Sequence, residues 1–383
     1  MGIRAHGARG GSFGHGRLEC EYCAQGSPVG DALNRNFASD NVSPVCAPVM
    51  AAIEAANRGP TGSYGADPFT ERLTMLAREV FETDLVIYPV STGTAANALA
   101  LSQIAPPFGG VYCYDGAHIA VDECGAPEFF TGGAKLLGFP SPTGKITPAQ
   151  LSAAVAAAQG MGVHHVRPSA VSLSQATELG TVYSLEEIEA IDEVAKRHGL
   201  PVHMDGARFA NALVRLGCSP AEATWKRGID VLSLGASKNG ALCAEAVVFF
   251  DGARAVEFER RRKQAGHLWS KLRYLSAQLV AYLEDDVWLE NARQANAMAA
   301  RLARGLAEVP GARLLQAVDG NEIFAALPEA LIARLETAGF HFYRWPLLAV
   351  EDGAAAVRLV TSYASTVADV EDFLGETRKL NSA

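Results

Sequence analysis

One lysine occupies a turn of small residues between two apolar runs that have the length of β-strands. The runs cover residues 231–234 and 246–250, and Lys238 stands between them among Ser, Asn, Gly and Ala. An ammonium group in a buried sheet is costly unless the amine is deprotonated or covalently used. Because a Schiff base with pyridoxal phosphate (PLP) uses an amine in this way, we interpret Lys238 as a cofactor-binding lysine.

Upstream, Asp205 ends an apolar run at residues 201–204 and precedes a helix-like segment at 207–213. Because side chains alternate along a strand, Asp205 faces away from Met204 and projects at the carboxyl end, where parallel sheets bind ligands. A carboxylate there can hold the proton on the cofactor's pyridine nitrogen and keep the ring electron-poor. A helix N-cap is the alternative interpretation, and the presence of Lys238 downstream favours the cofactor role.

Two further segments have the residue types that a bound cofactor needs. Thr92, Gly93 and Thr94 follow an apolar run and open a helix, where free N–H groups and the helix dipole favour an anion such as a phosphate. His118 follows the next strand, and its ring could lie flat on a pyridine ring or exchange a proton with the substrate. An ordinary helix cap and an ordinary histidine are the respective alternatives.

Three residues are candidates for binding the substrate. Arg208 lies three residues after Asp205, and Arg358 lies in a strand-like run near the C-terminus. Either arginine could bind a carboxylate through paired hydrogen bonds, although a surface charge is the simpler interpretation of Arg358. Tyr64 lies in a turn-rich loop before a helix, so it is either a site residue or part of a plain turn.

Strands and helices alternate along most of the chain. Strands are expected at residues 85–90, 111–114, 134–139, 169–173, 201–204, 231–234 and 246–250, and helices at 47–57, 67–81, 95–104, 148–158 and 185–198. Strands that are apolar on both faces and separated by helices predict an α/β fold with a mostly parallel sheet covered on both sides. One long helical stretch is expected at 253–284.

The length of 383 residues favours two domains. Residues 1–33 are rich in Gly, Arg and His and are predicted to form a flexible tail, with a transit peptide as the minor alternative. We assign residues 34–284 to a large cofactor-binding domain. Residues 285–383 are predicted to form a smaller C-terminal α/β domain with strands such as 322–326 and 356–360.

Composition excludes several classes of function. A formal net charge of −9 and a single short basic run, residues 260–263, argue against nucleic acid as a partner. No apolar segment is long enough to span a membrane, so no membrane partner is expected. Seven cysteines in no disulfide-like pattern predict a cytoplasmic protein. Cys20 and Cys23 lack a second ligand pair, and no metal is expected.

Together these segments resemble the low-specificity L-threonine aldolase family, within the fold-type-I PLP enzymes, from about Asn36 to the C-terminus. A segment at residues 37–41 resembles the family's Arg-Ser-Asp-Thr. The most specific segments are Ser63-Tyr64-Gly65-Ala66-Asp67-Pro68, His203-Met204-Asp205-Gly206-Ala207-Arg208, Ser237-Lys238-Asn239-Gly240 and Arg358-Leu359-Val360-Thr361.

The resemblance implies retro-aldol cleavage of L-threonine, L-allo-threonine or a related L-β-hydroxy-α-amino acid, phenylserine included, to glycine and an aldehyde. The implied catalytic residues are Lys238, which forms the Schiff base, Asp205, which pairs with the pyridinium, and His118, which stacks on the ring. The implied cofactor ligands are Thr92, Gly93, Thr94, His118, Asp205, Arg208 and Lys238. The implied substrate ligands are Ser39, Tyr64, Arg208 and Arg358, with Tyr64 supplied by a neighbouring subunit of a homodimer or homotetramer.

The chain also departs from the family's pattern. Where many members have Glu-Asn-Thr-His-Asn, it reads Ser174-Gln175-Ala176-Thr177-Glu178, so a histidine near the β-hydroxyl group is absent. The base that takes the hydroxyl proton is therefore open between His118, a water molecule and another group. The alternatives for function are β-elimination or transamination on the same scaffold, or a PLP-fold binding protein that has lost catalysis.

Overall fold

The computed structural model of the chain describes residues 33–346 and 348–379. The predicted tail, apart from Leu33, and the pair Cys20 and Cys23 lie outside the described residues. From Arg35 onward the chain forms one compact unit. None of the helices in the described ranges has the length and apolar character that crossing a membrane demands.

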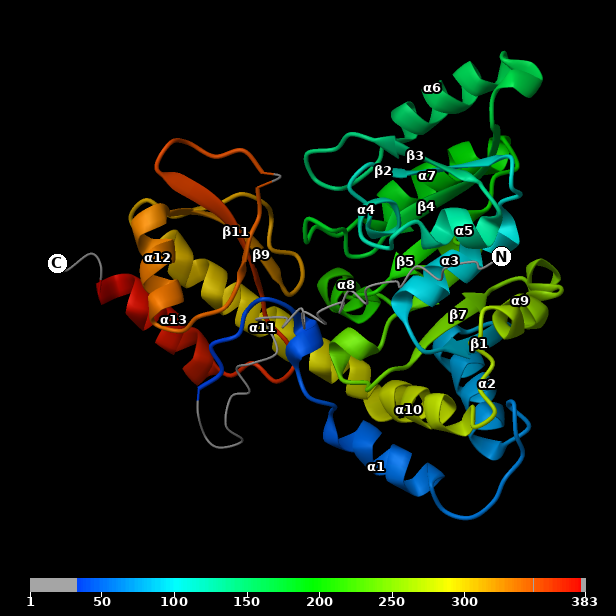
Figure 1. The fold of residues 1–383 in the computed structure, drawn as a ribbon, viewed down its shortest axis with the longest axis horizontal. Helices are drawn as coiled ribbons and strands as arrows, with labels where there is room; N and C mark the ends of the chain where they lie inside the picture. Colours follow the sequence, from blue (N-terminus) through cyan, green and yellow to red (C-terminus); the bar gives the residue numbers. More distant parts are fainter. Residues whose placement is uncertain (1–32, 347, 380–383) are drawn as a thin grey trace, which may run out of the picture. The chain divides into compact units, whose positions relative to one another are not determined.

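A seven-stranded sheet forms the centre of the larger part (Figure 1). Its order is β1-β7-β6-β5-β4-β2-β3, and β7 is antiparallel to both of its neighbours while the other pairs are parallel. The predicted α/β fold with a mostly parallel sheet is therefore confirmed. The strands are β1 (Val86–Val90), β2 (Gly109–Tyr114), β3 (Lys135–Phe139), β4 (Arg167–Ser174), β5 (Val202–Gly206), β6 (Val231–Leu234) and β7 (Glu245–Phe249).

Helices cover both faces of this sheet because successive strand residues point to opposite sides. Leu232 belongs to a core cluster with residues of α2, α6, α7 and α10, whereas its neighbour Val231 packs in a separate cluster with α3 and α9. The helices of this part are α1 (Ala47–Ala56), α2 (Pro68–Phe81), α3 (Gly93–Ile104), α4 (His118–Val121), α5 (Ala126–Thr131), α6 (Pro148–Gln159), α7 (Leu185–Arg197), α8 (Phe209–Leu216), α9 (Phe258–Gln264) and α10 (Arg273–Leu283).

The single long helix expected at 253–284 is wrong. The segment contains a 3₁₀ turn at Gly252–Ala255 and the separate helices α9 and α10. Gly266 has a φ of 80°, and the N–H of His267 bonds back to the carbonyl of Arg262 at 2.9 Å. A left-handed glycine with a bond of this kind ends a helix, and the apolar periodicity alone does not reveal it.

A second sheet, β10-β11-β9-β8, lies beyond residue 284 and is entirely antiparallel. Its elements are α11 (Val287–Ala307), β8 (Arg313–Leu314), β9 (Glu322–Pro328), α12 (Glu329–Thr337), β10 (Tyr343–Arg344), β11 (Ala354–Val360) and α13 (Val367–Lys379). Phe37 packs into the core of this sheet against Phe340 and Phe373. The domain boundary at 284 stays a prediction.

Candidate active site

The strands β4, β5 and β6 bring their carboxyl ends to one edge of the sheet. In the strand register Ser174 lies beside Asp205, and Asp205 lies beside Ser233. A cavity of about 460 Å³ opens at this edge, where parallel sheets bind ligands. The predicted site residues that line it are Thr92, Gly93, Thr94, His118, Asp205, Arg208 and Lys238.

A larger hollow of about 670 Å³ lies at the opposite ends of the strands. Its lining includes Arg167 and Ser169 at the start of β4 and Pro201 just before β5, but no lysine and no carboxylate. The volume of a cavity therefore does not identify the active site in this protein. The smaller cavity is the candidate, because it gathers the groups that can do chemistry.

Lys238 lies on a 3₁₀ turn, Ser237–Asn239, whose backbone is hydrogen-bonded by a buried carboxylate. Glu245 on β7 accepts the N–H of Ala236 at 2.7 Å and that of Ser237 at 3.3 Å. Burial raises the pKa of Glu245. Among the described residues, none forms a hydrogen bond or an ion pair with Lys238 Nζ. The turn is thus fixed while the amine is left available.

Asp205 is nearly fully buried, and both of its oxygens accept hydrogen bonds. Oδ1 accepts the N–H of Ala207 at 3.0 Å, and Oδ2 accepts Nδ2 of Asn97 at 2.7 Å. The helix α8 begins at Phe209 with Arg208 in the N-cap position, so Asp205 does not cap it. The N-cap interpretation of Asp205 is therefore wrong.

Asn97 and Glu123 connect Asp205 to His118. The Asn97 amide also donates to Glu123 Oε1 at 2.8 Å, and the same oxygen lies 2.9 Å from His118 Nδ1. The hydrogen bond with Glu123 raises the pKa of His118, although burial acts in the opposite direction. His118 is therefore held in one orientation, with its ring on the edge of the cavity.

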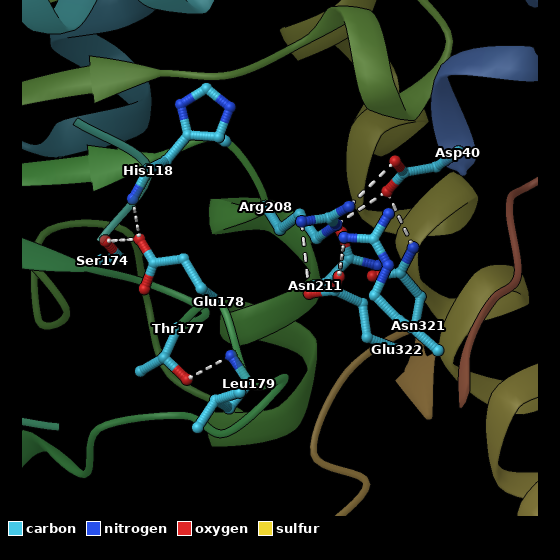
Figure 2. A network of polar contacts seen from close by, with 12 residues as sticks. Asp40, His118, Ser174, Thr177, Glu178, Leu179, Arg208, Asn211, Asn321 and Glu322 are labelled. Carbon is cyan, nitrogen blue, oxygen red and sulfur yellow. Dashed lines mark hydrogen bonds and ion pairs between the residues drawn. The ribbon is translucent and has the colours of Figure 1, made fainter. Parts of the chain in front are cut away.

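Glu178 follows the end of β4 and lies next to these hydrogen-bonded residues. Its Oε1 accepts the backbone N–H of His118 at 2.9 Å and the hydroxyl of Ser174 at 2.6 Å (Figure 2). Three buried polar atoms around the cavity have no hydrogen-bond partner among the described residues: Asn97 Oδ1, Glu123 Oε2 and Glu178 Oε2. We name the five residues Asn97, His118, Glu123, Glu178 and Asp205 the carboxylate cluster.

The start of α3 provides a place for an anion. Thr92 is the N-cap, and its hydroxyl accepts the N–H of Ala95 at 3.1 Å. The N–H groups of Gly93 and Thr94 have no acceptor within the helix, as in the first turn of any helix. Apart from its chain neighbours and the backbone of its own helix, no described heavy atom lies within 4 Å of where a Cβ on Gly93 would stand, so a phosphate could approach the backbone closely.

Arg208 is held by two carboxylates. Its guanidinium bonds Asp40 through Nε at 2.8 Å and Nη2 at 3.0 Å, and its Nη1 lies 3.2 Å from Glu322 (Figure 2). Arg358 Nη1 lies 3.8 Å from Glu322, and Asn321 donates to Asp40 at 3.0 Å. Burial acts to raise the pKa of Asp40, but attraction to Arg208 and Lys238 and the hydrogen bonds from Arg208 and Asn321 together lower it. We name Asp40, Arg208, Asn321, Glu322 and Arg358 the arginine cluster.

Three predicted site residues do not line the cavity. Ser39 accepts the N–H of Asn41 at 3.1 Å. Tyr64 is about half exposed, with its ring centre 4.6 Å from Lys263 Nζ. Arg358 reaches the site through the arginine cluster. The roles of all three stay predictions.

Sequence reasoning missed four residues around the cavity: Asn97, Glu123, Glu178 and Glu245. Asn97 carries a signal, because it is the one amide in the buried Ala- and Leu-rich part of α3, and a buried amide needs partners. Glu245 is the first residue of β7 and directly precedes its apolar residues. Glu123 and Glu178 lie in loops among other polar residues, where nothing in the sequence singles them out.

These groups fit PLP. The free amine of Lys238 can attach an aldehyde, the carboxylate of Asp205 can hold a protonated ring nitrogen, and the first turn of α3 can bind a phosphate. The three kinds of group line one cavity of sufficient size.

Known proteins agree with this assignment. The family model for β-eliminating lyases matches residues 36–330. Low-specificity L-threonine aldolases from Pseudomonas sp. (strain NCIMB 10558) and Pseudomonas aeruginosa are 42% and 43% identical to the chain, each over 91% of it and 99% of the relative. A threonine aldolase structure from Leishmania major superposes with a TM-score of 0.85 at 29% identity, covering 91% of this chain and 99% of that one.

The fold and the lysine–aspartate site together define a fold-type-I PLP-dependent enzyme. A serine palmitoyltransferase from Sphingomonas wittichii shares the fold, with a TM-score of 0.65 at 18% identity over 91% of this chain and 87% of that one. The chain belongs to the β-eliminating lyase family and, within it, to the threonine aldolases. It is a PLP-dependent lyase.

Proposed function

We infer that the enzyme cleaves L-threonine and related L-β-hydroxy-α-amino acids to glycine and an aldehyde. The observation that carries this inference is the cavity that holds the free amine of Lys238 together with the buried carboxylate of Asp205. The identity of 42–43% to low-specificity L-threonine aldolases over nearly the whole chain supports L-threonine cleavage as the reaction. Bound PLP supplies an electron sink for the breaking Cα–Cβ bond.

The residues of the chain would bind, orient and protonate. Lys238 attaches the cofactor through its amine, and Asp205 keeps a proton on the ring nitrogen. Thr92, Gly93 and Thr94 bind the phosphate with the N–H groups at the start of α3. His118, fixed by Glu123, would cover the ring and so exclude water from one side of the cavity.

The arginine cluster is proposed to bind the substrate carboxylate. Arg208 lines the cavity but is already paired with Asp40 and Glu322. Arg358 keeps a buried Nε without a hydrogen-bond partner among the described residues, and the rings of Trp345 and Tyr343 lie about 5 Å from its guanidinium. We propose that Arg358 makes the direct contact together with Arg208, and that Ser39 adds a hydroxyl donor.

The proposed assembly is a homodimer or homotetramer with active sites at the subunit interface. Tyr64 is about half exposed and does not line its own cavity, which supports a role at a neighbouring site. Leu242 lines the cavity and is also exposed, as expected of an edge that a second subunit covers. Light scattering after size-exclusion chromatography measures the state directly.

A cytoplasmic location is also a proposal. The five described cysteines are all free thiols, as expected of a reducing compartment.

The test of function is product analysis. Purified protein with PLP is incubated with L-threonine, L-allo-threonine and phenylserine, and glycine and the aldehyde are measured. Equal amounts of both are expected, and the three rates give the substrate preference. Ammonia with a keto acid would instead indicate β-elimination, and turnover that needs an added keto acid would indicate transamination.

A further inference from the structure

Cleavage of a β-hydroxy-amino acid needs a base for the hydroxyl proton, and the chain lacks a histidine at the position where many family members have one. Thr177 stands there instead, and it is fully buried. Its hydroxyl lies 2.8 Å from that of Thr181 and 3.3 Å from the carbonyl of Thr143, and it accepts the N–H of Leu179. It also accepts the N–H of Thr181 at 3.2 Å, and a neutral hydroxyl with four such contacts does not serve as a base.

The next residue, Glu178, is held in one orientation at the cavity. Two donors bind Oε1, the Ser174 hydroxyl and the His118 N–H, so the carboxylate cannot rotate without losing both (Figure 2). Oε2 is buried and has no hydrogen-bond partner among the described residues. Because a buried acceptor without a donor is unfavourable, this oxygen is suited to receive a proton donor from a ligand.

The pKa of Glu178 also suits a base that works near neutral pH. Burial raises its pKa to about 7, and the charge of Asp205 adds to that rise, while the bonds from Ser174 and His118 act against it. The other titratable groups that its charge reaches are Cys113, Tyr114 and Tyr183. A base with a pKa near the working pH transfers protons most effectively.

We propose that Glu178 is the catalytic base that removes the β-hydroxyl proton of the substrate. The proposal rests on the function proposed above. The O–H bond breaks and its proton goes to Glu178 Oε2. The O–H electron pair forms the aldehyde C=O bond as the Cα–Cβ bond breaks, and bound PLP would supply the sink for the electron pair of that bond. A proton delivered to Cα, which balances the proton taken by Glu178, gives glycine.

His118 is the rival for this role. Its Nδ1 is occupied by Glu123, and its ring is expected to cover the cofactor, which leaves Nε2 for other contacts. The two assignments differ in what a Glu178 variant loses. If His118 were the base, Glu178 would only hold the backbone of His118, and all reactions at the site would fall together.

The experiment compares two reactions in the Glu178→Gln holoenzyme. Cleavage of L-threonine needs the hydroxyl proton removed, whereas exchange of the glycine α-proton with deuterated water, followed by NMR, involves no hydroxyl group. We expect cleavage to fall about 10²- to 10⁴-fold while glycine exchange stays within about threefold of the wild type. Glu187→Gln, which removes an exposed acid from the next helix, should leave both rates unchanged.

Two results would overturn the proposal: cleavage within about threefold of the wild type, or an equal loss of both reactions. If the wild type itself released no glycine, the proposed function would fail first, so the two failures are distinguishable. If Glu178→Gln does not fold, Glu178→Asp keeps a carboxylate but moves it back by one methylene. We then expect at least about tenfold slower cleavage with unchanged glycine exchange, and equal losses would overturn the proposal.

A second readout does not depend on turnover. Infrared difference spectra of the wild type between about pH 5 and 9 should contain a carboxylic-acid stretch that disappears with a midpoint close to pH 7 and is missing in Glu178→Gln. Absence of that band from the wild-type difference spectra would show that Glu178 does not change its protonation state between these pH values, which contradicts its assignment as a base tuned to neutral pH.

Discussion

The arginine cluster and the carboxylate cluster lie next to the same cavity and differ in how well their charges are matched. In the arginine cluster two arginines face two carboxylates at 2.8–3.8 Å, and the net charge is zero. In the carboxylate cluster three acids share one histidine, so acidic groups are in excess, while both clusters contain buried polar atoms without a hydrogen-bond partner among the described residues. The balanced charges of the first cluster stabilise the native fold, whereas the second cluster holds an excess of acids beside the cavity.

The comparison indicates that the arginine cluster contributes mainly to stability and the carboxylate cluster mainly to activity. Breaking a matched buried ion pair leaves a charge without a partner and destabilises the protein. Removing a poorly matched acid relieves an unfavourable burial, so stability rises while activity is lost. Substitutions in the two clusters should therefore have opposite signs in unfolding experiments.

The largest effect is expected at the amine that both clusters surround. Lys238→Ala should abolish the visible absorbance of bound PLP and lower turnover by about 10⁴-fold or more, because no other amine replaces it. The free energy of unfolding without PLP should change by less than about 1 kcal/mol, since Nζ makes no contact that the fold needs. Lys226→Ala, at an exposed pair with Glu82, is the control. A yellow, active Lys238→Ala enzyme would disprove the assignment.

Glu322→Ala tests the matched cluster. Loss of this carboxylate leaves Arg358 without its acid and Arg208 with one acid instead of two, so the free energy of unfolding should fall by about 3–5 kcal/mol. Urea denaturation measures the change. Glu351→Ala breaks the exposed pair with Arg313, which has a similar length of 3.0 Å, and should cost no more than about 1 kcal/mol. Equal losses in the two variants would remove the distinction between the clusters.

Glu178→Gln tests the unmatched cluster with the opposite sign. The pKa of Glu178 rises from 4.5 to about 7 on folding, so its contribution to stability is present below pH 4.5 and is lost as the pH rises through 7. At about 1.4 kcal/mol for each pKa unit, the variant should gain up to about 3 kcal/mol over the wild type between these limits. Urea unfolding at several pH values measures this. A difference between variant and wild type that does not change with pH would contradict it.

The smallest effect is expected from Glu123→Gln. This change replaces the carboxylate whose hydrogen bond raises the pKa of His118, so the NMR titration of the His118 ring should move to lower pH. Turnover should fall about tenfold, because the ring keeps a hydrogen-bond partner but loses its fixed position. Asp122→Asn, at the adjacent acid, should leave the His118 titration in place. An unshifted His118 in Glu123→Gln would show that burial, not Glu123, sets its pKa.

Much of the fold followed from short-range patterns. Apolar runs of strand length predicted the central strands, and the alternation of side chains placed Asp205 opposite the buried Met204. The break between α9 and α10 was missed, because one left-handed glycine ends a helix whose periodicity continues. The antiparallel direction of β7 depends on its pairing with β6 and β1 rather than on its own residues.

The sequence alone determined the class of chemistry, because the Lys238 turn, Asp205 at a strand end and the Thr92-Gly93-Thr94 helix start are local features. Only the tertiary structure decided which groups share the site. Asn97 meets Asp205 across 108 positions and Arg208 meets Asp40 across 168. Local patterns reflect backbone geometry among neighbours in the chain. The burial of Glu178 and the pairing of Arg208, in contrast, depend on atoms that folding brings together from distant segments, so no local signal encodes them.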